Sequence, residues 1–134
     1  MSGTRHRFIN PDTIARPTGY THVVETTGQR TVYISGQVAV DPQGNLVGVG
    51  DMQAQAEQVF QNLQAALAAV NASFNDVVKL TYFLVDIAQI QAVRAVRDRY
   101  IDPAHLPAST AVEVRQLVRP EFLLEIEAIA VLDE

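Results

Sequence analysis

Two alternating segments near the C-terminal end of the chain restrict the fold more than any other feature of the sequence. They are separated by a short polar break, Arg119-Pro120-Glu121. A strict period of two in side-chain character is typical of β-strands. In the first segment one face carries Thr110, Val112, Val114 and Gln116, and the other carries Ser109, Ala111, Glu113, Arg115 and Leu117. In the second segment one face carries Leu124, Ile126, Ala128 and Ala130, and the other carries Glu125, Glu127, Ile129 and Val131.

The break between the two segments predicts that they pair as a β-hairpin, because a proline is tolerated in a turn but not inside a central strand. In such a hairpin Arg115 would lie across from Glu125 and Glu127 on one side of the sheet. The same side would carry Ala111, Ile129 and Val131, which is not the composition of an ordinary solvated surface. We therefore expect this face to be covered and to hold a polar pocket.

Short strands are predicted earlier in the chain at Arg7–Ile9, His22–Thr26 and Thr31–Ser35. Gly28 lies between the last two and supplies the permissive backbone that a tight hairpin turn needs. A helix is predicted after Asp51, a residue type that caps helices well. Apolar residues then recur at spacings of three and four, which forms one buried stripe: Ala56, Val59, Phe60, Leu63, Leu67 and Val70.

A strand over Val77–Val85 is apolar on both faces, which is typical of a central strand. A second, more polar helix is outlined by Ile90, Val93, Arg97 and Tyr100, and Asp102-Pro103 ends it.

The predicted order is β-β-β-α-β-α-β-β in a single domain over residues 1–134. This is an α+β fold, with a mixed, mainly antiparallel sheet of about six strands and two helices on one face. Two helices cannot cover the second face of such a sheet, and an apolar face left uncovered predicts self-association.

Composition narrows the class of protein. The formal net charge is −5 and Lys79 is the only lysine, so nucleic acid is not the expected partner. The chain has no cysteine, which excludes disulfides and thiol catalysis. The three histidines lack metal-ligand spacing, and neither a metal nor a cofactor is expected. No apolar run approaches the length of a membrane span, so we expect a cytoplasmic protein without membrane partners.

Five segments together resemble the RidA family, also known as YjgF, RutC-like or L-PSP endoribonuclease-like. They read YISGQVAVDPQGNLVG at 33–48, QAEQVFQNLQAALAAV at 55–70, DVVKLTYFLVD at 76–86, PAST at 107–110 and EIEAIAV at 125–131. The resemblance implies a chorismate-mutase-like fold, a homotrimer with clefts between subunits, and no cofactor. It also implies hydrolysis of enamine or imine intermediates to 2-keto acids and ammonia.

The resemblance extends to individual site residues. The family's arginine, which holds the substrate carboxylate, falls at Ser109 in this chain, and a serine cannot supply that charge. The glutamate that positions water matches Glu125. Further cleft positions match Tyr20 and the pair Ser35 and Gly36, and by spacing alone the usual asparagine position falls at Arg94.

Two functions from different classes remain open at this stage. In the first, the protein is a hydrolase of altered specificity in which Arg94, or failing that Arg16, replaces the lost cation and Glu125 orients water. Its ligand would be a 2-keto or 2-imino acid. In the second, a trimer keeps the cleft and binds or senses a small metabolite without deaminating it. The structural alternatives are a solvated Arg94 and an ion pair between Glu125 and Arg115.

Overall fold

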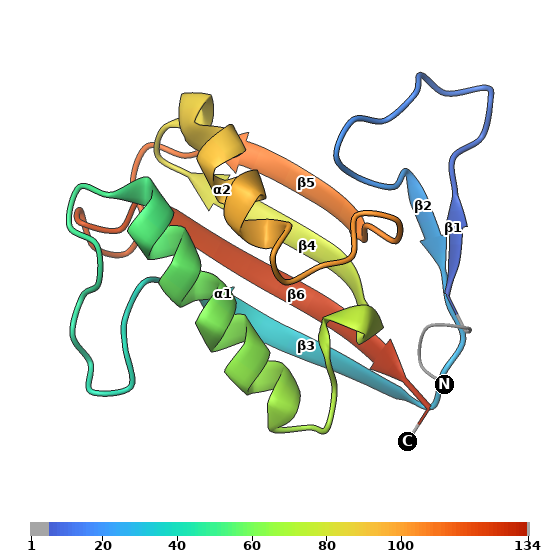
Figure 1. Cartoon of the computed structure of the whole chain (residues 1–134), viewed down its shortest axis with the longest axis horizontal. Helices are drawn as coiled ribbons and strands as arrows, with labels where there is room; N and C mark the ends of the chain where they lie inside the picture. Colours follow the sequence, from blue (N-terminus) through green and yellow to red (C-terminus); the bar gives the residue numbers. More distant parts are fainter. Residues whose placement is uncertain (1–5, 134) are drawn as a thin grey trace.

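The computed structural model describes residues 6–133 and consists of two sheets and two α-helices. Helices α1 (Met52–Ala68) and α2 (Ile90–Arg97) lie on the same face of the larger sheet (Figure 1). Two 3-10 turns, η2 (Phe74–Asp76) and η3 (Ile87–Gln89), flank its strand β4. The larger sheet has the order β3 (Arg30–Gln37), β6 (Leu124–Leu132), β4 (Val77–Leu84) and β5 (Ala108–Glu113), and the smaller one pairs β1 (Arg7–Ile9) with β2 (Val23–Glu25).

The strand directions confirm a mixed, mainly antiparallel α+β fold. Strand β6 runs antiparallel to both β3 and β4, whereas β4 and β5 are parallel. The predicted element order is also confirmed, but the six strands divide into sheets of four and two.

Helix α1 forms as its sequence predicts. The Asp51 side chain accepts a hydrogen bond from the Ala54 N–H at 3.1 Å and caps the first turn. The apolar stripe packs on the sheet, and Val59, Phe60 and Leu63 are fully buried. Each such side chain stabilises the fold by roughly 2 kcal/mol. Helix α2 ends at Arg97, one turn before the predicted end at Tyr100.

The predicted C-terminal hairpin is wrong. Strand β5 pairs in parallel with β4 at the edge of the sheet, and β6 lies between β3 and β4. The reason is burial, because Leu124 and Ile126 are completely buried and a hairpin at the edge would leave their strand with one neighbour. Arg115 consequently lies beyond the end of β5, exposed to solvent and away from the glutamates.

The predicted hairpin between the strands around Gly28 is wrong as well. Strand β2 pairs with β1, whereas β3 pairs with β6. Gly28 lies against the end of β6, where a Cβ would come within 2.6 Å of a Val131 methyl group and 2.9 Å of the Leu132 carbonyl oxygen. This glycine allows a close approach between chain segments rather than a two-residue turn.

The two faces of the sheet also differ from the prediction in one respect. Ala111 pairs with Tyr82, a buried residue on the helix side, and not with Phe83 on the open side. The open face carries a mixture of apolar and polar side chains, including Tyr33, which is 77% exposed. Lys79 and Thr110 form a hydrogen bond there at 2.8 Å.

A buried amide on α1 holds the segment that leads into β6. Gln55 is completely buried, and its Nε2 donates to the Gly48 carbonyl at 3.0 Å and the Glu121 carbonyl at 2.9 Å. Its Oε1 accepts from the Leu123 N–H at 2.8 Å. One side chain therefore ties the loop before α1 to the connection that carries the chain from β5 to the centre of the sheet.

We predict that Gln55→Leu destabilises the protein by about 2–4 kcal/mol, because it removes the hydrogen bonds that the buried Gln55 amide makes to backbone groups on three residues. Urea denaturation of the purified variant measures this. Gln53→Leu, at an exposed position of the same helix, is the matched control and should change the free energy of unfolding by no more than about 0.5 kcal/mol. Equal stability of the two variants would contradict the role assigned to Gln55.

Candidate active site

A cavity of about 180 Å³ lies between α2, strands β4 and β5, and the loop that precedes β2. The structure brings together three of the predicted site residues in this cavity, namely Tyr20, Arg94 and Ser109. The remaining lining residues are Tyr82, Ile90, Arg97 and Ala111. A cavity of this size, below the 300–1,000 Å³ usual for drug-sized ligands, is suited to a small molecule.

The loop that carries Tyr20 is fixed to the start of β5. The Thr21 N–H donates to the Pro107 carbonyl at 3.3 Å, and the Thr21 hydroxyl donates to the Leu106 carbonyl. Thr21 is itself buried, so these bonds are shielded from water. They hold Tyr20 close to Ser109, although the two residues are far apart in the sequence.

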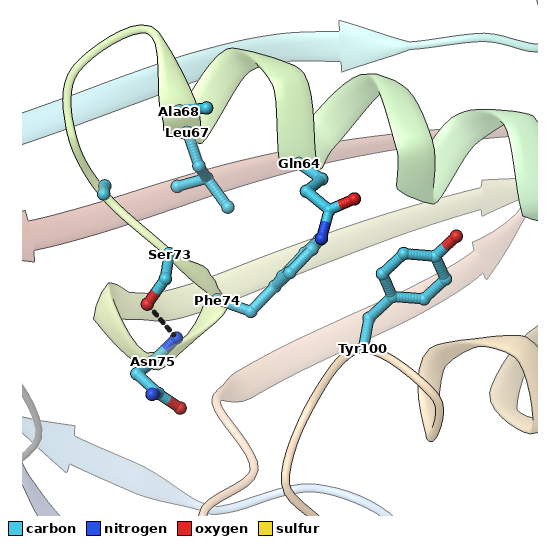
Figure 2. A pocket seen from close by; sticks show the side chains of 8 residues that line it. Gln64, Leu67, Ala68, Ser73, Phe74, Asn75 and Tyr100 are labelled. Carbon is cyan, nitrogen blue, oxygen red and sulfur yellow. Dashed lines mark hydrogen bonds between the residues drawn. The ribbon is translucent and has the colours of Figure 1, made fainter.

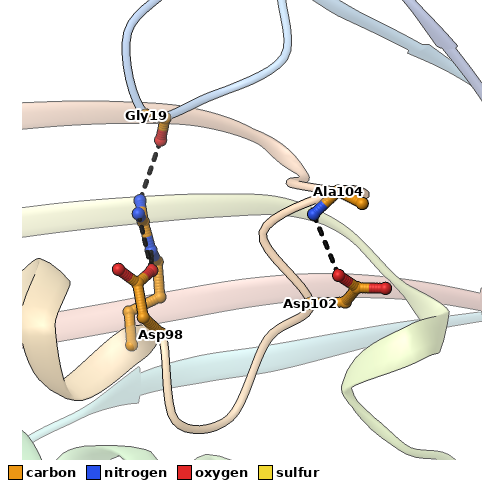
Figure 3. Close-up of polar contacts among 5 residues, drawn as sticks. Gly19, Asp98, Asp102 and Ala104 are labelled. Carbon is orange, nitrogen blue, oxygen red and sulfur yellow. Dashed lines mark hydrogen bonds and ion pairs between the residues drawn. The ribbon is translucent and has the colours of Figure 1, made fainter.

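Gly19 lies between the two arginines of α2. Its carbonyl accepts a hydrogen bond from Arg97 Nη1 at 2.8 Å, as Figure 3 shows. Its φ is +82°, a conformation that favours glycine, and a Cβ there would lie 3.3 Å from Arg94 Cζ. The guanidinium of Arg94 is thus packed against the loop backbone and is not a freely solvated side chain.

The two arginines differ in how their charge is balanced. Arg97 is 6% exposed, and its Nε and Nη2 donate to the Asp98 carboxylate at 3.0 Å and 2.9 Å. Arg94 is half-buried and forms no ion pair with any residue in the described range 6–133. The cavity therefore carries one positive charge without a local counter-ion.

Tyr82 lines the same cavity and is only 3% exposed. Burial raises the pKa of its phenol to about 12, against the opposing effect of the nearby Arg97 guanidinium. The guanidinium comes close to the hydroxyl, yet no group in residues 6–133 makes a hydrogen bond of acceptable geometry with it. Tyr82 is therefore a protonated, unused donor inside the cavity.

The other predicted site residues lie elsewhere. Glu125 pairs with Phe83 in the sheet and is half-buried on the open face, opposite to the helices. Gly36 lies directly beside it, since a Cβ at this position would collide with the Glu125 carboxylate. Ser35 precedes Gly36 at a register shift in β3 and is exposed.

One chain thus holds two separate groups of predicted site residues. Tyr20, Arg94 and Ser109 lie on the helix side, and Ser35, Gly36 and Glu125 lie towards the open side. Arg115 forms no ion pair with Glu125 in the described part of the chain.

Neighbouring cavities hold other side chains. Arg16 is exposed and lines a cavity of about 310 Å³ that shares Tyr20 with the first. A further cavity of about 270 Å³ lies between the end of α1, η2 and Tyr100 (Figure 2), and it contains no predicted site residue. Among residues 6–133, no three His, Asp or Glu side chains are grouped closely enough to hold a metal ion.

Sequence reasoning missed Tyr82 and Arg97 as lining residues. Arg97 served only to outline a polar helix, and Tyr82 was counted as one apolar residue of a buried strand. Two signals were available. Arg94 and Arg97 are spaced i, i+3 and so share a helix face, and a tyrosine in a fully buried strand must bury its hydroxyl as well.

We predict that Tyr82 makes the stability of the protein depend on pH between about 10 and 12. Because its folded-state pKa is raised, this contribution is fully present below pH 10 and is lost as the pH rises through the folded value. The loss approaches about 1.4 kcal/mol per pH unit. Urea denaturation across this range should show a shallower decline for Tyr82→Phe, and the same decline as wild type for Tyr33→Phe, an exposed control. Parallel curves for wild type and Tyr82→Phe would contradict the prediction.

Comparison with known proteins identifies the family. Residues 11–132 match the family described as Endoribonuclease L-PSP. A RutC family protein of Synechocystis is 40% identical over 75% of this chain and 78% of its own length. The mouse 2-iminobutanoate/2-iminopropanoate deaminase is 40% identical over 76% and 74%. A crystal structure of a Rid family protein of unknown function from Yersinia pestis superposes with a TM-score of 0.88 at 39% identity, covering 96% of this chain and 99% of that one. With its α+β fold, its sheet topology and these relatives, the chain is a member of the RidA/L-PSP family.

Proposed function

We propose that this protein is a hydrolase that converts small 2-imino acids, or the enamines in equilibrium with them, to 2-keto acids and ammonia. The observation that carries the proposal is Arg94, which lines the same cavity as Ser109 and has no acidic partner in the described chain. A guanidinium binds a carboxylate as a two-pronged donor. Arg94 would therefore supply the charge that Ser109 cannot. The mouse relative named as an iminobutanoate and iminopropanoate deaminase supports this class of substrate.

The reaction itself needs a base and water. Glu125 accepts a proton from water as the water oxygen attacks the carbon of the C=N bond, giving a tetrahedral carbinolamine. The proton then passes from Glu125 to the nitrogen. The carbinolamine hydroxyl then gives its proton to the nitrogen as the C–N bond breaks, so that ammonia leaves and the carbonyl of the 2-keto acid forms.

The complete site requires two chains in this proposal, because Arg94 and Glu125 belong to groups on opposite sides of one sheet. A contact that joins the cavity of one subunit to the open face of the next uses two different surfaces. Contacts of this head-to-tail kind close into rings, and a ring of three subunits is the arrangement that we propose. The mixed composition of the open face, with the exposed Tyr33, supports its burial against a neighbour.

The first test is turnover of imines generated by an amino-acid oxidase. Arg94→Gln should lower kcat/KM by about 10- to 100-fold through loss of a charged hydrogen-bonded contact. Glu125→Gln should lower kcat by about 100-fold or more. Arg115→Gln, at an exposed arginine that forms no ion pair within residues 6–133, is the matched control and should behave as wild type. Wild-type turnover that survives in Arg94→Gln would contradict the role of Arg94.

A second test addresses the sharing of the site between chains. Arg94→Gln and Glu125→Gln subunits, each expected to keep no more than about a tenth of wild-type activity, are unfolded together, refolded and assayed. If the site forms between subunits in a ring, random mixing rebuilds about a quarter of the sites with both native side chains. Activity in the mixture of about a quarter of the wild-type value, above that of either variant refolded separately, is the expected result. A mixture that refolds to the same oligomer and is no more active than the separate variants would mean that one chain carries the whole site.

A non-catalytic role is the second candidate, and Ser109 is the observation that favours it. Wild-type protein without turnover, but able to bind a 2-keto acid, would identify a metabolite-binding protein. Activity gained in Ser109→Arg would then show that the cleft remains intact and lacks only the missing charge.

A further inference from the structure

The cavity offers more guanidinium N–H donors than a single carboxylate requires. Arg94 and Arg97 both line it, and no Asp or Glu is among the lining residues. Asp98 does not line the cavity, and its carboxylate balances the charge of Arg97 but not that of Arg94. The proposed function uses Arg94 and gives Arg97 no part in ligand binding.

Arg97 retains binding capacity despite its burial. A guanidinium has five N–H donors. Three of those in Arg97 are engaged, two by the Asp98 carboxylate and one by the Gly19 carbonyl. These bonds fix the orientation of the side chain, so that its remaining donors are held in place for a ligand.

Tyr82 adds an independent observation. Tyr82 lines the cavity, and its buried hydroxyl has no hydrogen-bond partner of acceptable geometry in residues 6–133. A buried donor without a partner destabilises a protein, so its retention calls for an explanation. An acceptor oxygen of a bound ligand, placed near both Tyr82 and Arg97, satisfies this donor.

The two arginines lie one turn apart on the same face of α2, which suits a short ligand with an acidic group at each end. Residues at i and i+3 of a helix have Cβ atoms about 5–6 Å apart. This separation is comparable to that between the two carboxylate groups of an acid with four or five carbons. One carboxylate at Arg94 and another at Arg97 and Tyr82 would together use the donors of the cavity.

We propose that the ligand of this cavity is a dicarboxylate, a 2-imino acid of four or five carbons with a second carboxylate bound by Arg97 and the Tyr82 hydroxyl. The inference rests on the proposed function for the first carboxylate, at Arg94. It makes Arg97 and Tyr82 specificity-determining residues.

The test compares two stable 2-keto acids that differ only at the far end, 2-oxoglutarate and 2-oxopentanoate. Isothermal titration calorimetry of the full-length protein measures both dissociation constants without relying on turnover. We expect 2-oxoglutarate to bind at least about tenfold more tightly, because its second carboxylate gains charged hydrogen bonds. Tyr82→Phe should reduce that preference about tenfold or more.

Tyr82→Phe is suitable because the hydroxyl has no hydrogen bond of acceptable geometry to any group in residues 6–133, so the variant is expected to fold. Tyr100→Phe makes the same chemical change outside the cavity and should leave the preference unchanged. Thermal unfolding of both variants verifies that they are folded before titration.

The outcomes separate the two proposals. If 2-oxopentanoate binds in an Arg94-dependent way and 2-oxoglutarate has no advantage, the dicarboxylate inference is overturned and the proposed function stands. If neither acid binds to wild type, both proposals fail. If the advantage of 2-oxoglutarate exists but survives in Tyr82→Phe, the second carboxylate does not use this hydroxyl, and the assignment of Tyr82 is wrong.

Discussion

The position of β6 between β3 and β4 is the constraint on which the rest of the structure depends. Its helix-facing residues Leu124, Ile126, Ala128 and Ala130 are buried, and this burial is possible only if the strand has a neighbour on each edge and helices above it. Strand β5 is thereby displaced to the edge, next to β4. The edge is where α2 and the loop before β2 can enclose a cavity, so the site is a consequence of the sheet order.

The polar side chains buried between this sheet and the helices have different roles. Gln55 satisfies backbone groups on three residues and joins segments of the chain, so it contributes to the fold alone. Arg97 joins the loop at Gly19 to α2 in a similar way, yet it also lines the cavity. The Tyr82 hydroxyl makes no hydrogen bond of acceptable geometry to any group in the described chain. Burying a polar group without a hydrogen-bond partner lowers the stability of the fold. A buried polar group that lacks a partner is therefore explained by ligand binding, whereas one that is fully bonded is explained by the fold.

Sequence periodicity was enough to predict the helices and strands, but not the pairing of the strands. The stripe from Ala56 to Leu67 identifies α1 because helix formation is local, whereas the partner of β6 depends on burial summed over the whole sheet. The alternation in the C-terminal segments fits a hairpin and an inserted strand equally well. Arg94 was predicted from the resemblance, by counting from Asp86 to the family's asparagine position, and local geometry preserves such a count. Its neighbour Arg97 and the side chain of Tyr82 could be assigned to the cavity only from the three-dimensional structure.

The sheet order also has a consequence for synthesis on the ribosome. Strand β6 follows every other strand of the larger sheet in the chain, yet it lies between β3 and β4. While the polypeptide is growing, β3 has no partner in that sheet, and β4 can pair only with β5. The larger sheet is therefore completed after the last strand has left the exit tunnel, and pairings between distant segments are slow to form. Until then, the exposed edges of β3 and β4 are the part of the nascent chain most in need of protection by chaperones.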